Sequence, residues 1–191
     1  LLLDQSRRVA DYDPYDLRTL AAKHFIRRAR SSSQADMVAV AGFAGQGGDA
    51  SWPPLLQQLP LWAPSHTATV FSADRLAQEA AVDTLRPLVG GTAPVFDALG
   101  AALTLTAAQA PATGRRAIVA LLGGGDDSGL SESQRQAALA SLRQQQADTG
   151  IQVVLIAGQL DAESVERKNL AELAAALRAP IIYSGYPGDW R

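Results

Sequence analysis

Five short, continuous runs of apolar residues constrain the fold of this chain more than any other feature. Polar and apolar residues do not alternate in them, so both faces of each run should be buried, as in parallel strands that helices cover on each side. The runs are Leu1–Leu3, Met37–Ala41, Ala117–Leu122, Ile151–Ala157 and Ile181–Tyr183. A further segment, Leu55–Leu61, is more polar and is bordered by prolines, which favours an edge strand.

Amphipathic helical patterns lie between these runs, with apolar residues that recur three and four positions apart. The expected helices follow Asp13, Ser72, Thr92 and Ser131, and a last one contains Leu170, Leu173, Ala174 and Leu177. Asp13 is an expected N-cap with Pro14 at the first helical position. Ser72 is the expected cap of its helix, and Ser131 with Gln134 has the spacing of a capping box. Strands and helices that alternate in this order predict a doubly wound α/β sheet.

The composition is that of one globular domain. Of the 191 residues, 47% are hydrophobic and 19% are charged, which supplies a core and is too little charge for a disordered chain. The net charge of −2 predicts no nucleic-acid-binding face. The absence of cysteine excludes disulfides, thiolate metal sites and cysteine nucleophiles. We therefore expect residues 1–191 to form a single domain.

Within these residues we expect neither a membrane-spanning segment nor a signal peptide. No apolar run approaches the ~18 residues that span a bilayer, so we expect no membrane insertion in this segment. The first residues lack the basic, apolar and cleavage-site pattern of a signal peptide. The chain begins without Met inside an expected strand, and we interpret it as a segment clipped from a longer protein.

Three segments hold the motifs of greatest interest. In doubly wound sheets, ligands bind beyond the carboxyl ends of the strands, where the strand order reverses. The residues next to those ends are therefore the candidate site. They are Asp4-Gln5-Ser6-Arg7-Arg8 after the first strand, Gly90-Gly91-Thr92 before the helix with Asp97-Ala98-Leu99, and Gly123-Gly124-Gly125-Asp126-Asp127 after the strand at 117–122.

Together with the helix that follows Asp13-Pro14, these segments resemble the von Willebrand factor A (VWA) family, especially its bacterial members. The resemblance extends from Leu1 to about Tyr183. It implies a Rossmann-like, six-stranded, mostly parallel sheet with helices on both faces and an antiparallel edge strand. In the family a last helix follows the final strand. This chain ends at Arg191, so we expect that helix to be missing or supplied elsewhere.

The resemblance also implies a divalent-cation site, the metal-ion-dependent adhesion site of the family. Its ligands come from a D-x-S-x-S loop, a Thr in a second loop and an Asp in a third. Such hard cations take carboxylate, hydroxyl and water oxygens. This chain keeps Asp4 and Ser6 of the first loop and Thr92 of the second.

Two of the ligand positions are altered. Arg8 stands where the second Ser is expected, and Gly123, or Gly124 if the turn aligns one residue later, stands where the Asp is expected. Two unit charges ~4 Å apart repel by about 4 kcal/mol at an effective dielectric of 20. A guanidinium here, together with a lost carboxylate, predicts a degenerate site with no metal cofactor, Mg²⁺ included. Metal-dependent ligand binding would require Asp126 or Asp127 to rescue the site.

Without a metal, Asp4 and Ser6 have two interpretations. In the first, they satisfy backbone N–H groups of the loops at the end of a buried strand. In the second, Arg7 or Arg8 takes the place of the cation and pairs with Asp4 or with a partner's carboxylate.

The expected function is binding rather than catalysis. No G-x-S-x-G elbow surrounds a serine, and the loops do not supply a nucleophile, a base and a stabiliser together. We expect a module for protein–protein interaction, adhesion or scaffolding, with Arg7, Arg8, Asp126 and Asp127 as candidate partner-binding residues. The alternatives are a purely structural domain in a larger assembly and a nucleotide or small-molecule binder that uses the glycine turns. Bacterial relatives are commonly secreted or surface-attached, so an extracytoplasmic or cell-surface location is expected.

Overall fold

The computed structural model describes residues 1–13, 16–32, 37–45, 71–85, 91–111, 113–158 and 160–183. Five strands in these ranges form one sheet, and every neighbouring pair is parallel. The strands are β1 (Leu2–Asp4), β2 (Ala41–Phe43), β3 (Ala117–Leu122), β4 (Gln152–Ala157) and β5 (Ile181–Tyr183). Their order is β2-β1-β3-β4-β5, so the direction of winding reverses between β1 and β3.

The predicted α/β class with a parallel, doubly wound sheet is confirmed. The sheet has five strands in the described residues, whereas the resemblance implies six. The expected edge strand at Leu55–Leu61 lies outside the described residues. Strand β2 also begins later than the run Met37–Ala41 predicts. Val38 lies before it, buried, in an isolated antiparallel bridge to Ser72.

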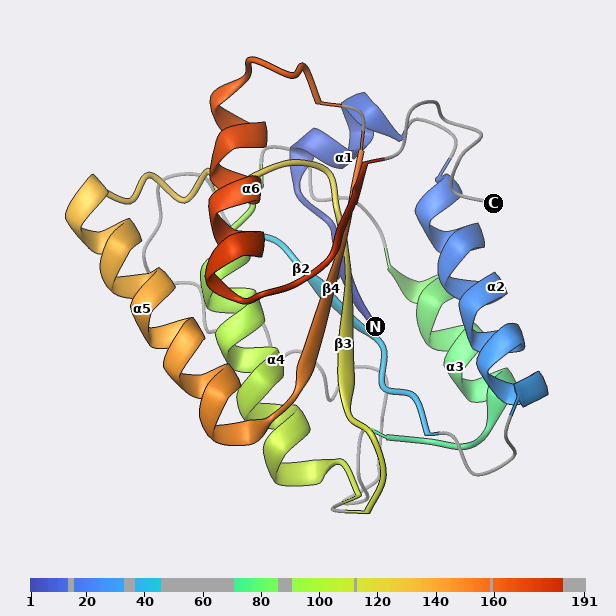
Figure 1. The fold of residues 1–191 in the computed structure, drawn as a ribbon. Helices are drawn as coiled ribbons and strands as arrows, with labels where there is room; N and C mark the ends of the chain where they lie inside the picture. Colours follow the sequence, from blue (N-terminus) through green and yellow to red (C-terminus); the bar gives the residue numbers. More distant parts are fainter. Residues whose placement is uncertain are drawn as a thin grey trace.

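Six helices lie in the described residues. They are α1 (Arg7–Tyr12), α2 (Leu17–Ser32), α3 (Arg75–Thr84), α4 (Val95–Gln109), α5 (Glu132–Thr149) and α6 (Val165–Ala176). Helices α4, α5 and α6 cover one face of the sheet and α2 and α3 the other, while the short α1 lies at the edge where β1 ends (Figure 1). None of the described helices is both long and apolar enough to cross a membrane.

Each face of the sheet has its own apolar layer. Ile118, Ala120 and Leu122 of β3 are buried in the larger layer, with residues of α4, α5 and α6. Leu3 of β1 and Leu121 of β3 are buried in the smaller layer, with residues of α2 and α3. The continuous apolar sequence of β3 follows from this arrangement, because successive side chains enter opposite layers.

Helices cover the α2 side of the sheet unevenly. The parallel register pairs Leu121 with Ile156 of β4, and Ile156 with Ile182 of β5, so these side chains share that face. Leu121 is buried, Ile156 is half-buried and Ile182 is exposed. Within the described residues, cover on this side therefore decreases from β3 toward β5.

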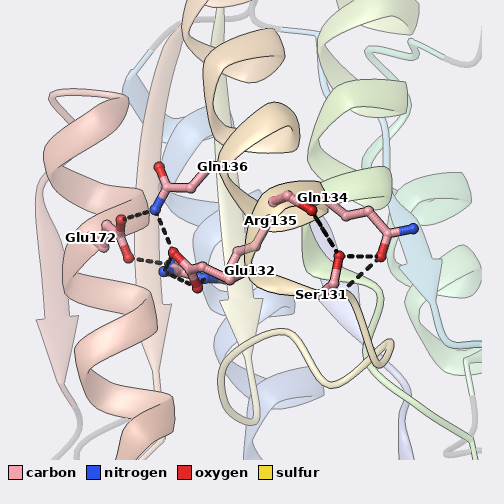
Figure 2. Close-up of polar contacts among 7 residues, drawn as sticks. Ser131, Glu132, Gln134, Arg135, Gln136 and Glu172 are labelled. Carbon is pink, nitrogen blue, oxygen red and sulfur yellow. Dashed lines mark hydrogen bonds and ion pairs between the residues drawn. The ribbon is translucent and has the colours of Figure 1, made fainter.

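The start of α5 confirms the predicted capping box. The Ser131 hydroxyl accepts a hydrogen bond from Gln134 N, and the Gln134 side chain accepts one from Ser131 N (Figure 2). Two N–H groups that the first turn leaves unpaired are satisfied in this way.

A polar cluster joins α5 to α6 at the surface (Figure 2). Arg135 forms ion pairs with Glu132 of its own helix and with Glu172 of α6. Gln136 Nε2 donates to both carboxylates, each at 2.9 Å. Hydrogen bonds lower the pKa of the Glu172 carboxyl, the one from Arg135 more than the one from Gln136. These contacts hold α6 beside α5, and the first turn of α6 contributes Glu166 to the candidate site.

Two helix starts differ from the sequence prediction. Asp74, not Ser72, caps α3, because Asp74 Oδ1 accepts from Leu76 N and Ala77 N, while Ser72 Oγ accepts from Asp74 N. Helix α2 begins at Leu17 rather than at Pro14, which lies outside the described residues.

The Asp13 carboxylate still caps α2, across a longer turn than predicted. Its Oδ1 accepts from Leu17 N at 2.6 Å and its Oδ2 from Arg18 N at 2.9 Å. Asp16, just before the helix, has a φ of 56°, in the left-handed region that Asp tolerates better than most residues.

Candidate functional site

The three segments singled out in the sequence meet at the carboxyl edge of the sheet. Backbone or side-chain hydrogen bonds connect each pair of them. These are Arg7 N to Gly91 O (2.9 Å), Gly123 N to Asp4 Oδ2 (2.9 Å) and Asp127 N to Ala93 O (3.2 Å). The meeting point lies beside β1 and β3, where the winding reverses, which is the usual place for a ligand site in this fold.

Asp4 ends β1 and is fully buried. Its Oδ1 accepts a hydrogen bond from Ser6 N at 2.7 Å, and its Oδ2 accepts one from Gly123 N at 2.9 Å. Burial raises the pKa of the Asp4 carboxyl and outweighs these hydrogen bonds, which lower it. The two hydrogen bonds fasten the first loop to the third, as the loop-satisfying interpretation of Asp4 requires.

The burial of Asp4 predicts the pH dependence of an Asp4→Asn variant. The pKa of Asp4 is raised in the folded chain above its ordinary value of 3.8, so the folded state binds this proton more tightly than the unfolded state. The stability of the wild type relative to Asp4→Asn is therefore greatest below the ordinary pKa and decreases as the pH rises through the folded pKa. Urea unfolding of both proteins between about pH 4 and pH 7 measures the difference. A wild type that becomes more stable relative to Asp4→Asn as the pH rises would contradict the prediction.

Ser6 and Thr92 are the two hydroxyl residues that the VWA resemblance places in metal-binding loops. Ser6 is fully buried, and its Oγ lies near enough to help lower the pKa of Asp4, yet it forms no well-aligned hydrogen bond with any described residue. Thr92 exchanges two backbone hydrogen bonds of 2.8 Å with Gly45. A Cβ on Gly45 would clash with Thr92 Oγ1, so any larger residue at position 45 would require the Thr92 side chain to move.

Arg8 lies across the third loop. Its Nε is 3.0 Å from Asp127 Oδ2, and its Nη2 is 3.4 Å from Glu166 Oε1 of α6. A Cβ on Gly124 would lie 3.0 Å from Arg8 Nη1, so the guanidinium fills the space that a side chain at position 124 would need. One cationic side chain therefore bridges α1, the third loop and α6.

The glycine turn after β3 packs against protein atoms on several sides. A Cβ on Gly123 would lie 3.0 Å from Val9 Cγ2 and 3.3 Å from Asp4 Oδ2, and one on Gly125 would lie 3.0 Å from Glu166 O. These glycines permit close approach of the turn to α1 and α6. Of the two alignments of the family's Asp, only position 124 has a neighbour that could give way, because Arg8 is a long side chain.

Asp126 and Asp127 hold the second loop in place. Asp126 Oδ2 accepts from Phe96 N, in the first turn of α4, at 3.0 Å, and the Asp127 side chain accepts from Ala93 N. The other Asp127 oxygen faces Arg8. Both carboxylates are already engaged, by backbone N–H groups of the second loop and, for Asp127, by Arg8, so the geometry lends no support to a metal site rescued by these two residues.

A buried polar group that the sequence does not predict lies beside the first loop. Arg18 is only 2% exposed. It forms ion pairs with Asp13 at 3.1 Å and Asp16 at 2.9 Å, and its Nη2 donates to Gln5 Oε1 at 3.2 Å. The group joins the start of α2 to the residue after β1. The sequence shows Asp13, Asp16 and Arg18 within six residues, but it does not show that Arg18 is buried.

The described residues do not fit the cation that the VWA resemblance implies. Ser6 Oγ is a buried oxygen that could face a metal ion. However, position 124 offers no carboxylate, and the guanidinium of Arg8 lies where one would be needed. Within the described ranges, no three His, Cys, Asp or Glu side chains are grouped so that they could hold a metal ion.

The fold and the site define a class, a parallel doubly wound α/β domain whose loops close on one another at the switch point. No protein-family model matches this chain, and no curated protein matches it.

Proposed function

We propose that this chain is a VWA-type domain that binds another protein through the carboxyl edge of its sheet, without a bound cation. The three sequence motifs support the family, and the parallel order β2-β1-β3-β4-β5 is compatible with it. By analogy with bacterial relatives, the proposed setting is extracytoplasmic or at the cell surface. No residue is assigned a catalytic role.

The position of Arg8 is the observation that carries this proposal. A bound cation in the family joins three loops by ligating oxygens from each. In this chain, Arg8 of the first loop reaches Asp127 of the third, and Asp127 in turn binds Ala93 of the second. The guanidinium of Arg8 thus joins the loops in place of a bound cation, and the Glu166 carboxylate is a second negative charge beside it. The loops are held together for binding without metal.

Arg7 is the side chain best placed to meet a partner. It is exposed, whereas Arg8 is largely covered by Asp127 and Glu166. Arg7 also begins α1, and its backbone N–H is fixed by Gly91 O. An exposed guanidinium whose backbone is held at this edge suits a carboxylate of a partner protein.

Reversal of the charge at Arg7 tests the proposal. Partners captured on the wild-type chain from cells of its source are titrated against wild type and Arg7→Glu. We expect Arg7→Glu to bind about tenfold more weakly, equivalent to about 1.4 kcal/mol. Because no cation takes part, EDTA should leave wild-type binding unchanged.

Arg143→Glu is the matched control, because Arg143 is an exposed arginine on α5, away from the carboxyl edge. It should bind as the wild type does. Equal binding by Arg7→Glu and the wild type would remove the binding role of this edge and favour a purely structural domain. Loss of binding in EDTA would contradict the cation-free mechanism.

A further inference from the structure

A cavity of about 540 Å³ lies at the amino edge of the sheet, opposite the candidate site. In a parallel sheet the amino ends of all strands share one edge. Leu1 precedes β1, Met37 precedes β2 and Ala117 begins β3, and all three line this cavity. Helix α2 and the segment between α4 and β3 supply much of the wall described here, and Phe71, before α3, and Thr106, on α4, also line it. The cavity is therefore separate from the edge assigned to partner binding.

The described lining is mostly apolar with cations at one side. Phe25 of α2, Met37, Phe71 and Val119 contribute apolar surface, and Phe25 and Met37 are exposed large apolar residues. Volumes of about 300–1,000 Å³ with apolar walls and a few polar groups are typical of small-molecule sites. Apolar side chains open to solvent at such a cavity are costly unless something covers them.

Arg115 and Arg116 supply the charge. Arg116 Nη2 donates to Thr149 O at 2.9 Å, which fixes its side chain, whereas Arg115 is exposed. No Asp or Glu is among the described residues that line the cavity. Among the described residues, the site thus offers apolar walls and a positively charged side, which complement an apolar molecule with one anionic group.

We propose that this cavity binds a small amphipathic carboxylate, such as a medium-chain fatty acid, with its chain against Phe25 and Met37 and its carboxylate at Arg115. The apolar chain provides the affinity by leaving water. The charge provides the preference for a carboxylate over a neutral or cationic head group. This assignment does not depend on the proposed partner-binding function.

Calorimetric titration of the chain with decanoate tests the proposal. We expect decanoate to bind at least about fivefold more tightly than decanol or decyltrimethylammonium, and acetate not to bind measurably. Arg115→Gln should weaken decanoate binding about fivefold and remove the preference over decanol. Phe25→Ala should weaken decanoate and decanol alike, because it removes apolar wall and no charge.

Two control variants and a size measurement complete the test. Leu20→Ala removes an exposed apolar side chain from the same helix as Phe25, and Arg143→Gln removes an exposed arginine from α5; both should bind decanoate as the wild type does. Several results would overturn the proposal: no binding of decanoate, equal binding of the three decyl compounds, or equal effects of the variants and their controls. A dimer by light scattering that decanoate does not disperse would instead assign this face to a second copy of the chain.

Discussion

Replacement of Arg18 by Met is expected to lower the free energy of unfolding by about 3–5 kcal/mol, the usual cost of removing one partner from a buried ion pair. Methionine fills a similar volume, so the loss comes from the polar partners rather than from a cavity. Asp13 is buried beside the start of α2 and would lose the guanidinium that lies 3.1 Å from it. Gln5 Oε1, also buried, would lose its donor. Urea or thermal unfolding measures the change.

Arg27→Met is the matched control for this experiment. Arg27 lies on the same helix and pairs with Glu79 of α3 through two hydrogen bonds, but its side chain is 55% exposed. Solvent weakens exposed ion pairs, so the control should change the free energy of unfolding far less than Arg18→Met does. Arg18→Lys should recover only part of the loss, because an ammonium keeps the charge but not the planar fork that reaches Asp13 and Gln5 together. If Arg18→Met and Arg27→Met lowered the free energy of unfolding equally, the burial of the Arg18 ion pairs would not add to their contribution to stability.

Strand positions in this chain were predictable because a parallel sheet leaves no face for polar residues. The runs at Ala117–Leu122 and Ile181–Tyr183 coincide with β3 and β5. The run at Met37–Ala41 misplaces β2, since Val38 and Val40 are buried without pairing to β1, while the paired residues extend to Gly42 and Phe43. An apolar run indicates only that its residues are buried. Which of them pair with a neighbouring strand depends on the position of that strand, which the run itself does not give.

The candidate site was predictable as a location and not as a set of contacts. The carboxyl ends of parallel strands share an edge, so the sequence places Asp4, Thr92 and Gly123 near one another. The partner of Arg8 in α6 was not foreseen. Glu166 is far away in the sequence and belongs to a helix whose first turn has no distinguishing motif. Long side chains choose partners by rotamer and local charge, which sequence order does not encode.

The sequence predicts a turn at the glycines of the third loop, but it does not predict what that turn contacts. Their presence predicts a tight turn, which could equally cradle a phosphate or permit close packing. The structure favours close packing over a phosphate site, because a side chain at Gly123 would meet Val9 and Asp4 and one at Gly124 would meet Arg8. Gly124 and Arg8 are complementary in volume, because the guanidinium of Arg8 occupies the space that a side chain at position 124 would take.

That complementarity predicts that two substitutions together create a cation site that the wild type lacks. Arg8→Ser/Gly124→Asp removes the guanidinium and supplies a carboxylate at the place it leaves. Asp4, Ser6 and Thr92 lie on loops that meet at the same edge of the sheet. These oxygens suit Mg²⁺ or Mn²⁺. We expect the double variant to bind Mn²⁺ with a Kd of about 1 mM or lower, or about 4 kcal/mol of binding free energy, while the wild type binds none. Isothermal titration calorimetry measures both.

Single and displaced variants identify the cause of any gain. Arg8→Ser alone lacks the new carboxylate, and Gly124→Asp alone places it against the guanidinium, so each should bind Mn²⁺ at least tenfold more weakly than the double variant. Arg8→Ser/Gly123→Asp moves the carboxylate by one residue, where its Cβ would meet Val9 Cγ2 at 3.0 Å and Asp4 Oδ2 at 3.3 Å, and it should be less stable and bind no metal. Equal Mn²⁺ binding by wild type and the double variant would show that Arg8 does not block a cation. A folded double variant that binds no Mn²⁺ would show that Asp4, Ser6 and Thr92 are not remnants of a metal site, and the VWA assignment would lose its strongest support.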